Sequence, residues 1–275
     1  MSTQAFLVSG SGNDFLALVE PPEPPHPERV RAWCRRGVSI GVDGVFVLAR
    51  TADPRVVRMD YWNADGTAAE LCGNGTRCAA ELAFELGWAA DEVSVETGAG
   101  TFAGRRAGPG RVELEAPLPA AAPEEREVEA LGGRYHGYWT RVGVPYFVIP
   151  WAGELRSAPV QELGPVLRHH PSFAPDGVNV DFVLYPLRNR LEMRVYERGV
   201  EAETLASGTG ILAAALTGIA TGRLELPVTA ETESGFPAVV RGELGPDGLP
   251  RRWSLEGDAR LVARIEPLPG ALAQP

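Results

Sequence analysis

Residues 61–80 read YWNADGTAAELCGNGTRCAA, and the rest of the chain is organised around this stretch. It is typical of a strand end and a polar loop followed by a helix that begins at Cys72. Gly73, Asn74 and Gly75 leave backbone N–H groups uncovered by bulky side chains. Those donors and the helix dipole can hold a carboxylate and favour a thiolate at Cys72. A buried cysteine in an ordinary glycine-capped helix is the alternative that this stretch alone leaves open.

The pattern recurs 135 residues later along the chain. The matched pairs are Cys72–Gly75 with Ser207–Gly210, Tyr61 with Tyr196, Gly87 with Gly222 and Val93–Thr97 with Val228–Thr232; at an offset of 136, Gly41-Val42 matches Gly177-Val178 and Phe46–Leu48 matches Phe182–Leu184. The ordered set predicts two structural repeats of one α/β unit. Because there are only two copies of long period, we expect a pseudo-twofold pair of domains rather than a solenoid.

The ligand site of such a pair is expected in the cleft between the repeats, where two helix N-termini can point at one small anion. Residues 72 and 207 would then flank the α-carbon of an amino acid from opposite faces. If both were thiols, one could remove the α-proton while the other delivered one, inverting the centre without a cofactor. A thiol suits this task because its reference pKa of about 8.5 is readily lowered at a helix N-terminus.

The domain boundary is predicted in residues 117–127, which are rich in proline, alanine and acidic residues. This gives an N-terminal repeat domain of residues 1–117, to which residues 262–275 return, and a C-terminal repeat domain of residues 118–261. The helix after Cys72 is predicted to run to Leu86 and to stop at Gly87.

Composition excludes several classes of function. The chain has no lysine, so it lacks both the Schiff-base residue of a pyridoxal-phosphate enzyme and the lysine of a P-loop. Its net charge of −10 argues against nucleic acid as a partner. We find neither a signal peptide nor an apolar run of membrane-spanning length. Three cysteines without a disulfide pattern favour the cytoplasm, and no cysteine and histidine spacing predicts a metal site.

Five motifs together resemble those of the diaminopimelate epimerases, over essentially the whole chain. They are Asn63–Gly66 with Glu70–Cys78, Glu197–Gly210, Gly12–Phe15, Gly41–Gly44 and Gly177–Phe182. The resemblance implies an α+β fold of two similar domains, each a mixed sheet curled around a central helix. It also implies inversion of one stereocentre of diaminopimelate, a precursor of lysine and of the cell wall, by a pair of cysteines and without a cofactor.

The resemblance further implies roles for individual residues. Cys72 is implied as one catalytic base, with Ser207 at the position of the second. The residues implied in binding the reacting carboxylate through backbone N–H groups are Gly73, Asn74, Gly208 and Thr209. Those implied in recognising the other end of the substrate are Asn13, Asn63, Asn179, Glu197 and Arg198, of which Arg198 suits a carboxylate and Glu197 an ammonium group.

Three positions depart from the family pattern. Ser207 stands where the family has its second cysteine, and a hydroxyl is a far weaker acid than a thiol. The family's Gly-Asn-Pro-His motif reads Gly-Val-Pro-Tyr at 143–146, so Val144 loses an amide and Tyr146 replaces a histidine. An engineered change would account for Ser207 alone, whereas Val144 and Tyr146 favour native divergence.

Three hypotheses follow. The first is a cofactor-independent epimerase acting on a diaminopimelate-like dicarboxylate, with Cys72 as the base. The second is a diverged isomerase or dehydratase acting on another small amino acid, because related cofactor-free proline racemases and hydroxyproline dehydratases are known with serine or threonine at one of the two positions. The third is a non-catalytic amino-acid binder. Family members often form dimers, and the sequence leaves a homodimer open.

Overall fold

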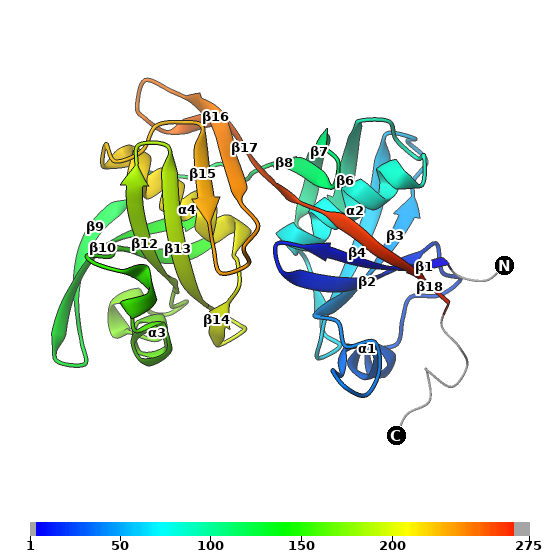
Figure 1. Ribbon diagram of the computed structural model, residues 1–275, viewed down its shortest axis with the longest axis horizontal. Coiled ribbons are helices and arrows are strands. Elements are labelled where there is room, and N and C mark those ends of the chain that lie inside the picture. The colour runs from blue at the N-terminus through cyan, green and yellow to red at the C-terminus, as the bar shows by residue number, and fades with distance from the viewer. Residues whose placement is uncertain (1–3, 267–275) are drawn as a thin grey trace. The chain divides into compact units, whose positions relative to one another are not determined.

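A computed structural model describes residues 4–266 of the 275-residue chain. The described chain divides into two compact units, one formed by residues 4–114 and 257–266 and the other by residues 115–256 (Figure 1). The first unit is therefore assembled from both ends of the chain. The sequence predicts that residues 262–275 return to this unit. Of these, residues 267–275 lie outside the described residues.

The first unit is a mixed sheet wrapped around one helix. Its elements are β1 (Gln4–Gly10), β2 (Asn13–Val19), α1 (Pro27–Cys34), β3 (Gly44–Arg50), β4 (Val56–Asn63), β5 (Ala68–Ala69), α2 (Gly73–Glu85), β6 (Glu92–Thr97), β7 (Gly100–Gly108), β8 (Arg111–Glu115) and β18 (Arg260–Ile265). Strands β2 and β3 are parallel, as are β4 and β6, whereas β1 pairs antiparallel with both β2 and β18.

The second unit repeats this plan. Its elements are β9 (Glu124–Ala130), β10 (Gly133–Val142), β11 (Val144–Pro150), α3 (Val160–Arg168), β12 (Asn179–Leu187), β13 (Arg190–Glu197), β14 (Ala202–Thr204), α4 (Gly208–Ala220), β15 (Val228–Glu231), β16 (Ala238–Leu244) and β17 (Pro250–Asp258), with short 3-10 turns at Leu155–Ser157 and Pro171–Phe173. Parallel pairs β11–β12 and β13–β15 correspond to β2–β3 and β4–β6 of the first unit.

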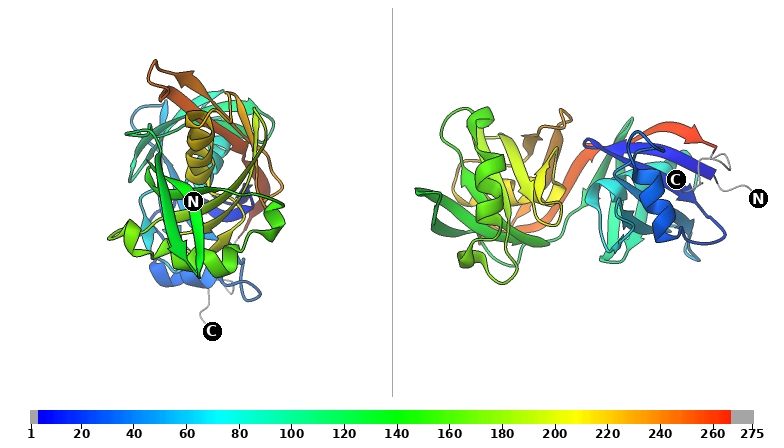
Figure 2. Two further views of the ribbon diagram at one scale, coloured as in Figure 1. Left: turned by 90° about the vertical axis from the view of Figure 1, so that its left-hand side faces the viewer. Right: turned by 90° about the horizontal axis from the view of Figure 1, so that it is seen from below.

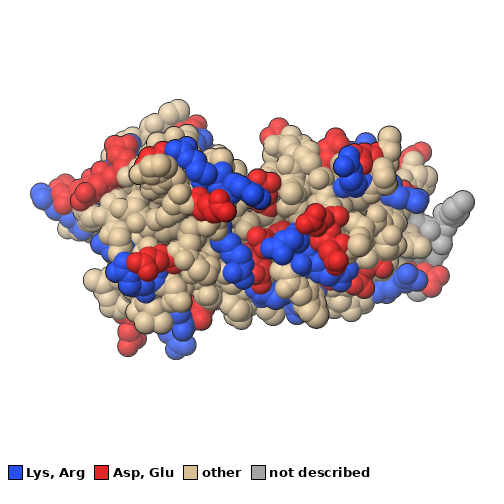
Figure 3. All heavy atoms as spheres, turned by 90° about the horizontal axis from the view of Figure 1, so that it is seen from above, with Lys and Arg blue, Asp and Glu red and all other residues tan. Residues whose placement is uncertain are grey.

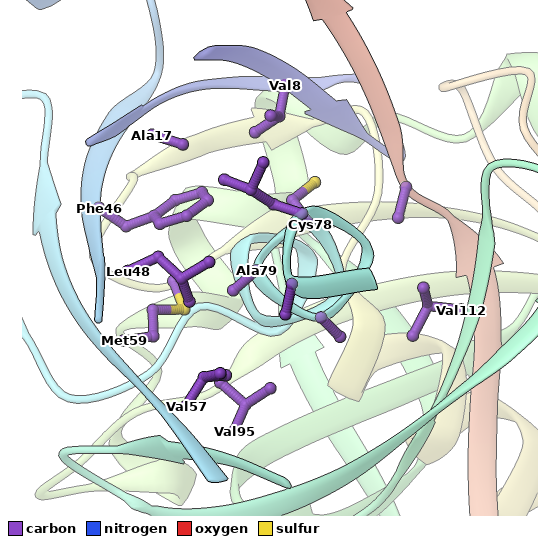
Figure 4. Close-up of a cluster of buried hydrophobic side chains, with 14 of the residues drawn as sticks. Val8, Ala17, Phe46, Leu48, Val57, Met59, Cys78, Ala79, Val95 and Val112 are labelled. Carbon is purple, nitrogen blue, oxygen red and sulfur yellow. The ribbon is translucent and has the colours of Figure 1, made fainter. Parts of the chain in front are cut away.

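Helix α2 forms the centre of the first core, and the surrounding strands point apolar side chains at it (Figure 4). Val8, Phe46, Leu48 and Val95 come from three strands, β1, β3 and β6, and are all fully buried. The helix ends at Glu85 and is followed by Gly87 at φ +70°, which confirms the predicted stop. Because the sheet curls around the helix, almost every side chain from position 74 to position 84 of α2 is buried.

Helix α4 has the same place in the second unit, where strands flank it in both views of Figure 2. Residues 210–218 are buried without interruption, so the helix has no polar face. This agrees with a helix enclosed by its own sheet rather than packed on a solvent-facing surface. The predicted fold, α+β with two domains that each wrap a mixed sheet around a central helix, is confirmed.

A shorter helix packs on the other face of each sheet. Helix α1 packs there in the first unit and α3 in the second. Gly164 lets α3 approach β13 closely, since a Cβ atom at this position would lie 2.6 Å from the Cβ of Tyr196. Both central helices are therefore shielded by strands, and only their N-terminal ends carry polar side chains relevant to chemistry.

Strand register corrects two of the sequence matches between the repeats. Tyr61 lies opposite Ala69, three residues before Cys72, whereas Val195 lies opposite Thr204, three residues before Ser207. Tyr61 therefore corresponds to Val195 and not to Tyr196, which packs against α3. The matched aromatic residues occupy opposite faces of their sheets, because one residue of register reverses a strand's faces.

The match of Phe46 with Phe182 is also wrong. Phe46 packs against α2, but Phe182 belongs to the core around α3. Phe46 pairs with Tyr61, and Asp181 pairs with Val195, so Asp181 occupies the position corresponding to Phe46. The offset of 136 holds for Gly41 and Gly177, which both have positive φ, and falls to 135 within the strand that follows.

Candidate active site

Cys72 is the N-cap of α2. Its φ and ψ of −137° and 105° are extended, and its Sγ accepts a hydrogen bond from Gly75 N at 3.4 Å. The first intrahelical hydrogen bond runs from Thr76 N to Cys72 O at 2.8 Å. The amides of Gly73 and Asn74 precede it and have no acceptor in the described part of the chain. Their N–H groups are therefore oriented to bind an anion beside the thiol.

Two glycines at the start of this helix, Gly73 and Gly75, are surrounded differently. A Cβ atom at position 75 would lie 2.9 Å from the Cε of Met59 and 3.4 Å from the Cys72 Sγ, so a larger residue would have to displace the end of the Met59 side chain. A Cβ atom at Gly73 would meet nothing within 4 Å, and the backbone there is helical. Neither packing nor conformation requires glycine at 73, but its absent side chain leaves the N–H groups open to a ligand.

Asn74 and Asn13, both predicted to bind substrate, are joined directly. Asn74 Nδ2 donates to Asn13 Oδ1 at 2.8 Å, and Asn13 Nδ2 donates to Asp43 Oδ2 at 3.2 Å. Arg77 Nη2 donates to Asn74 Oδ1 at 2.5 Å. These bonds determine which way each carboxamide points, a feature that sequence alone does not reveal.

Tyr61 and Asn63 lie at the end of β4, on the approach to Cys72. Burial, followed by the negative charge of Cys72, raises the pKa of Tyr61, so this side chain stays a neutral phenol. Asn63 is exposed, and its Nδ2 donates to Thr67 Oγ1 at 3.3 Å. By register Asn63 corresponds to Glu197 of the second unit, and both are predicted substrate ligands.

Ser207 has the same position at α4 that Cys72 has at α2. Its φ and ψ are −122° and 115°, and its Oγ accepts from Gly210 N at 3.3 Å. Ile211 N donates to Ser207 O at 2.9 Å, which leaves the amides of Gly208 and Thr209 ahead of the first intrahelical bond. The N-cap geometry of the two helices is thus reproduced although the atom at the cap differs.

Tyr146, one of the departures from the family pattern, contacts Ser207 directly. The two hydroxyl oxygens lie 3.2 Å apart, and the Tyr146 hydroxyl is 2.6 Å from Thr209 Oγ1. Tyr146 is fully buried, and burial raises its pKa, so it remains a phenol. It can donate to the serine oxygen without being ionised.

An acidic pair lies near the Tyr146 side chain. Asp181 is fully buried, and neither of its carboxylate oxygens has a hydrogen-bond partner. Burial, followed by the charge of Glu197, raises the pKa of Asp181 well above its usual range. Burial also raises the pKa of Glu197, partly offset by the neighbouring hydroxyls of Thr204 and Ser207. Asp181, buried and without a hydrogen-bond partner, therefore holds its proton more strongly than an exposed aspartate does.

Arg198 and Asn179 are linked through the backbone. Asn179 Oδ1 accepts from Arg198 N at 2.8 Å, and Asn179 Nδ2 donates to Pro145 O at 3.0 Å. The Arg198 guanidinium donates to the Asp176 carbonyl at 3.2 Å and forms no ion pair with a carboxylate of the described residues. Its charge is thus open to an acidic ligand, whereas the buried Asn179 serves in this structure to position the Arg198 backbone.

Hydrogen bonds join Asn74 at the start of α2 to Asn13, whereas the side chain of Asn63 bonds Thr67 in the loop after β4. In the second unit the predicted residues divide between the start of α4 and the neighbouring ends of β12 and β13. We call Asn13, Asn63, Cys72, Gly73 and Asn74 the Cys72 site, and Asn179, Glu197, Arg198, Ser207, Gly208 and Thr209 the Ser207 site. Sequence reasoning missed Arg77, Asp181 and Asp258. The signal for Asp181 was a charged residue inside an otherwise apolar strand run, Val180–Leu184.

The remaining cysteines differ from Cys72. Burial raises the pKa of Cys34 to about 11 and that of Cys78 further still. Both are buried, whereas Cys72 is partly exposed. Among residues 4–266, no group of three or more histidine, cysteine or carboxylate side chains could hold a metal ion. No helix in the same range is both long and apolar enough to cross a membrane.

Basic and acidic side chains are interspersed on the face shown in Figure 3. Many arginines there and elsewhere pair with carboxylates, for example Arg36 with Asp14 and Asp43 at 3.0 and 2.7 Å. Such exposed pairs contribute little to stability. Arginines without an acidic partner, such as Arg198, are therefore the informative ones for binding.

Comparison with known proteins agrees with this geometry. The family model for diaminopimelate epimerase matches residues 6–112 and 138–240. A diaminopimelate epimerase of Aquifex aeolicus is 34% identical over 240 residues, covering 83% of this chain and 86% of that protein. One of Gemmatimonas aurantiaca is 35% identical over 274 residues, covering 94% and 97%.

Solved structures of related fold include a probable proline racemase from Agrobacterium radiobacter K84 with a TM-score of 0.70 at 17% identity, covering 98% of this chain and 96% of that one. A hydroxyproline epimerase from Agrobacterium vitis has a TM-score of 0.67 at 17% identity, covering 96% and 91%. At this identity the likeness concerns the fold. The family model and the sequence relatives carry the assignment further: this chain belongs to the diaminopimelate epimerase family.

Proposed function

We propose that this chain is a cofactor-independent epimerase that inverts the α-carbon of a diaminopimelate-like amino acid. The observation that carries the proposal is the duplicated helix cap. Cys72 and Ser207 each cap a helix enclosed by its own sheet, and each is followed by two N–H groups ahead of the first intrahelical bond. Family membership supports the substrate class.

In the proposed reaction the Cys72 thiolate removes the α-proton. An S–H bond forms while the Cα–H bond breaks, and the electron pair left on carbon delocalises into the carboxylate. The backbone N–H groups of Gly73 and Asn74, together with those of Gly208 and Thr209, stabilise the charge that develops there. No redox step or external group is required.

Ser207 is the proposed proton donor to the opposite face. The O–H bond of Ser207 breaks as the new Cα–H bond forms. The Tyr146 hydroxyl, 3.2 Å away, donates a hydrogen bond to the serine oxygen and stabilises the negative charge that develops on that oxygen. Because a hydroxyl is a much weaker acid than a thiol, we expect this half of the reaction to limit the rate.

The far end of the substrate is assigned to charged groups of the Ser207 site. The unpaired Arg198 guanidinium matches a carboxylate in geometry, and the half-buried Glu197 suits an ammonium group. Asn13 and Asn63 are proposed as further ligands, while Asn179 acts by holding the Arg198 backbone.

Solvent exchange tests the proposal. The full chain is incubated with each stereoisomer of diaminopimelate in deuterated water, and α-deuterium and stereochemistry are followed by mass spectrometry and chiral chromatography. We expect deuterium at the α-carbon and a mixture of isomers, and Cys72→Ala is expected to reduce exchange roughly 1000-fold. Absence of exchange from every isomer would contradict the proposal.

A second candidate function is favoured by Ser207, Val144 and Tyr146. A site that keeps protons on Tyr146 and Asp181 is suited to protonating a leaving hydroxyl, which is the step a dehydratase needs. Release of a keto acid from small hydroxyamino acids, without epimerisation of diaminopimelate, would support this function. Ligand-dependent thermal stabilisation without any exchange would instead indicate a binding protein.

We further propose that the chain forms a homodimer, as members of the family often do, and that it is located in the cytoplasm, as its cysteine pattern suggests. Analytical ultracentrifugation and cell fractionation test them. Neither is needed for the proposed chemistry.

A further inference from the structure

Arg77 is a buried cation in the first part of α2, five residues after Cys72. Its side chain is 2% exposed and is the largest fully buried side chain of the described residues. Within residues 4–266 its guanidinium bonds Ser11, Asn74 and the backbone carbonyl of Asp258, and it forms no ion pair. A buried charge without a direct counter-ion is costly, so its presence points to a role that compensates the cost.

Every hydrogen bond of the Arg77 guanidinium goes to a neutral oxygen. Nη2 donates to Ser11 Oγ at 2.8 Å and to Asn74 Oδ1 at 2.5 Å, and Nε donates to Asp258 O at 3.5 Å. The Asp258 carboxylate instead accepts from Ser11 N at 2.7 Å and from Arg260 Nε at 3.2 Å. The positive charge of Arg77 is thus positioned by hydrogen bonds but not neutralised by contact.

The negative groups that act on Arg77 include the catalytic thiol. Burial lowers the pKa of Arg77, and the positive charge of Arg111 adds to this effect, whereas Asp258 and an ionised Cys72 raise it. Cys78 would also raise it if ionised, but burial raises its own pKa and keeps it neutral near pH 7. The interaction of two charges is mutual, so a guanidinium stabilised by the Cys72 thiolate stabilises that thiolate equally. In a buried setting this attraction is weakly screened by solvent.

The second unit provides a natural control. At the position that corresponds to Arg77, five residues after Ser207, α4 carries Leu212, which is 2% exposed. The helix whose cap can ionise contains a buried cation, and the helix whose cap is a hydroxyl contains an apolar side chain. The difference between otherwise matched helices therefore follows the chemistry of the cap.

We propose that Arg77 is a positioning residue for Cys72: its buried charge stabilises the thiolate, and its hydrogen bond to Asn74 orients the Asn74–Asn13 pair. This rests on the proposed role of Cys72 as the base. Arg77 contacts neither Cys72 nor a substrate directly, and it acts through the field at the helix start and through Asn74.

The other titratable and charged groups around Cys72 determine how the test is designed. Tyr61 faces it from β4, Cys78 lies on the same helix, and Asp258 approaches from the end of β17. Tyr61 and Cys78 have raised pKa values and stay neutral near pH 7. Asp258 is therefore the negative group that opposes Arg77 in this environment, and Arg111 of β8 adds a second positive charge.

The rate of Cys72 alkylation by iodoacetamide as a function of pH measures the thiolate directly, and peptide mapping distinguishes Cys72 from Cys34 and Cys78. We expect Arg77→Gln to raise the apparent pKa of alkylation by about one unit, and to slow alkylation about tenfold at pH 7. Arg77→Lys retains the charge and should leave the profile close to that of the wild type. It should raise KM more than it lowers kcat, because Asn74 loses its geometric partner.

If Arg77→Gln does not fold, Arg77→Met, which has a similar length and no charge, takes its place and should shift the alkylation profile in the same direction. Asp258→Asn preserves the acceptor for Ser11 N but removes a negative charge, so it is the control of opposite sign and alkylation should shift to lower pH. An unchanged profile in a folded Arg77→Gln or Arg77→Met overturns the proposal. Since the assay needs no substrate, its outcome is independent of whether the chain epimerises diaminopimelate.

Discussion

At the scale of single residues, the two caps have opposite electrostatic surroundings. Cys72 lies on a helix with a buried guanidinium, whereas Ser207 lies beside Tyr146 and near the acids Asp181 and Glu197. The first setting favours a negative charge and the second favours a bound proton. This difference supports Cys72 as the base and the Ser207 site as the proton donor in one direction of the reaction, with the two roles exchanged in the reverse direction.

Restoring a thiol tests this assignment of roles. Ser207→Cys should increase epimerisation of diaminopimelate about 100-fold, because a thiol is a far better proton donor than a hydroxyl. The measurement is the initial rate of isomer interconversion, with Ser207→Ala as the control that lacks a donor. If Ser207→Cys is no faster, the pocket around Val144 and Tyr146 has been redirected to another substrate.

Two further substitutions near residue 207 extend the same experiment. Adding Val144→Asn and Tyr146→His to Ser207→Cys recreates the Gly-Asn-Pro-His pattern of the family. We expect the triple variant to exceed Ser207→Cys in kcat/KM for diaminopimelate. A triple variant slower than the single variant would argue that Tyr146 has become part of the native chemistry.

At the scale of elements, α2 and α4 share cap geometry but differ in what the adjoining strands supply. Register places Phe15 and Phe46 in the first unit where Tyr146 and Asp181 stand in the second. Phe15 and Phe46 are in contact, with ring centroids 6.3 Å apart. An aromatic pair beneath one helix is thus replaced by a phenol and an acid beneath the other.

The buried acid makes stability depend on pH in a defined direction. The folded-state pKa of Asp181 is raised above its unfolded value, so folding is favoured most when this group is protonated. Its contribution is fully present below about pH 4 and is lost as pH rises through the folded-state pKa. We therefore expect Asp181→Asn to be more stable than the wild type at pH 7 and to lose that advantage near pH 4.

Thermal or urea unfolding at several pH values measures this difference. The pKa of Glu197 is also raised, so a variant of Glu197 is needed to separate the contributions of the two acids. Glu197→Gln should also flatten the pH dependence, but it removes a proposed substrate ligand, whereas Asp181→Asn does not. Equal stability of the wild type and Asp181→Asn at pH 7 would contradict a protonated, unpartnered Asp181.

The N-cap bond at Ser207 has a separate, structural value. Ser207→Ala removes the acceptor for Gly210 N and should cost about 1 kcal/mol of unfolding free energy. Denaturant titration measures this cost, and Ser207→Cys, which preserves an acceptor at the cap, is the matched control. No loss of stability in Ser207→Ala would mean that the cap bond is not maintained in solution.

At the scale of the whole molecule, the first unit depends on the last part of the chain. Strand β18 pairs with β1, and the Asp258 carboxylate accepts hydrogen bonds from the backbone N–H and the hydroxyl of Ser11. A chain that ends at Glu256 lacks both contacts and exposes the edge of β1. We expect residues 4–114 to become sensitive to limited proteolysis while residues 115–256 remain protected.

The matched control for truncation is Val262→Thr in the full chain, since Val262 is 54% exposed and its change leaves the strand pairing intact. This variant should be as resistant as the wild type. Uniform digestion of the truncated chain would instead show that the two units do not unfold independently.

The amino-acid sequence by itself determined much of this protein. Residues 61–80 and their copy 135 residues later predicted two repeated units and two capped helices, because glycine-rich helix starts and C-terminal glycines are local signals. Family motifs then pointed to Cys72, Ser207 and their neighbours. The predictions of the fold and of the capped helices succeed because caps, turns and apolar periodicity depend on residues close together in the chain, whereas the roles of the site residues stay predictions.

Other features were decided only by the tertiary structure. The match of Tyr61 with Tyr196 was off by one residue, since strand register depends on pairing partners far along the chain. Asp181 became notable only once it was found buried and unpartnered, and Arg77 only once Ser11, Asn74 and Asp258 were found around it. Burial and long-range hydrogen bonding, which convert an ordinary charge into a functional one, exist only after the chain has folded.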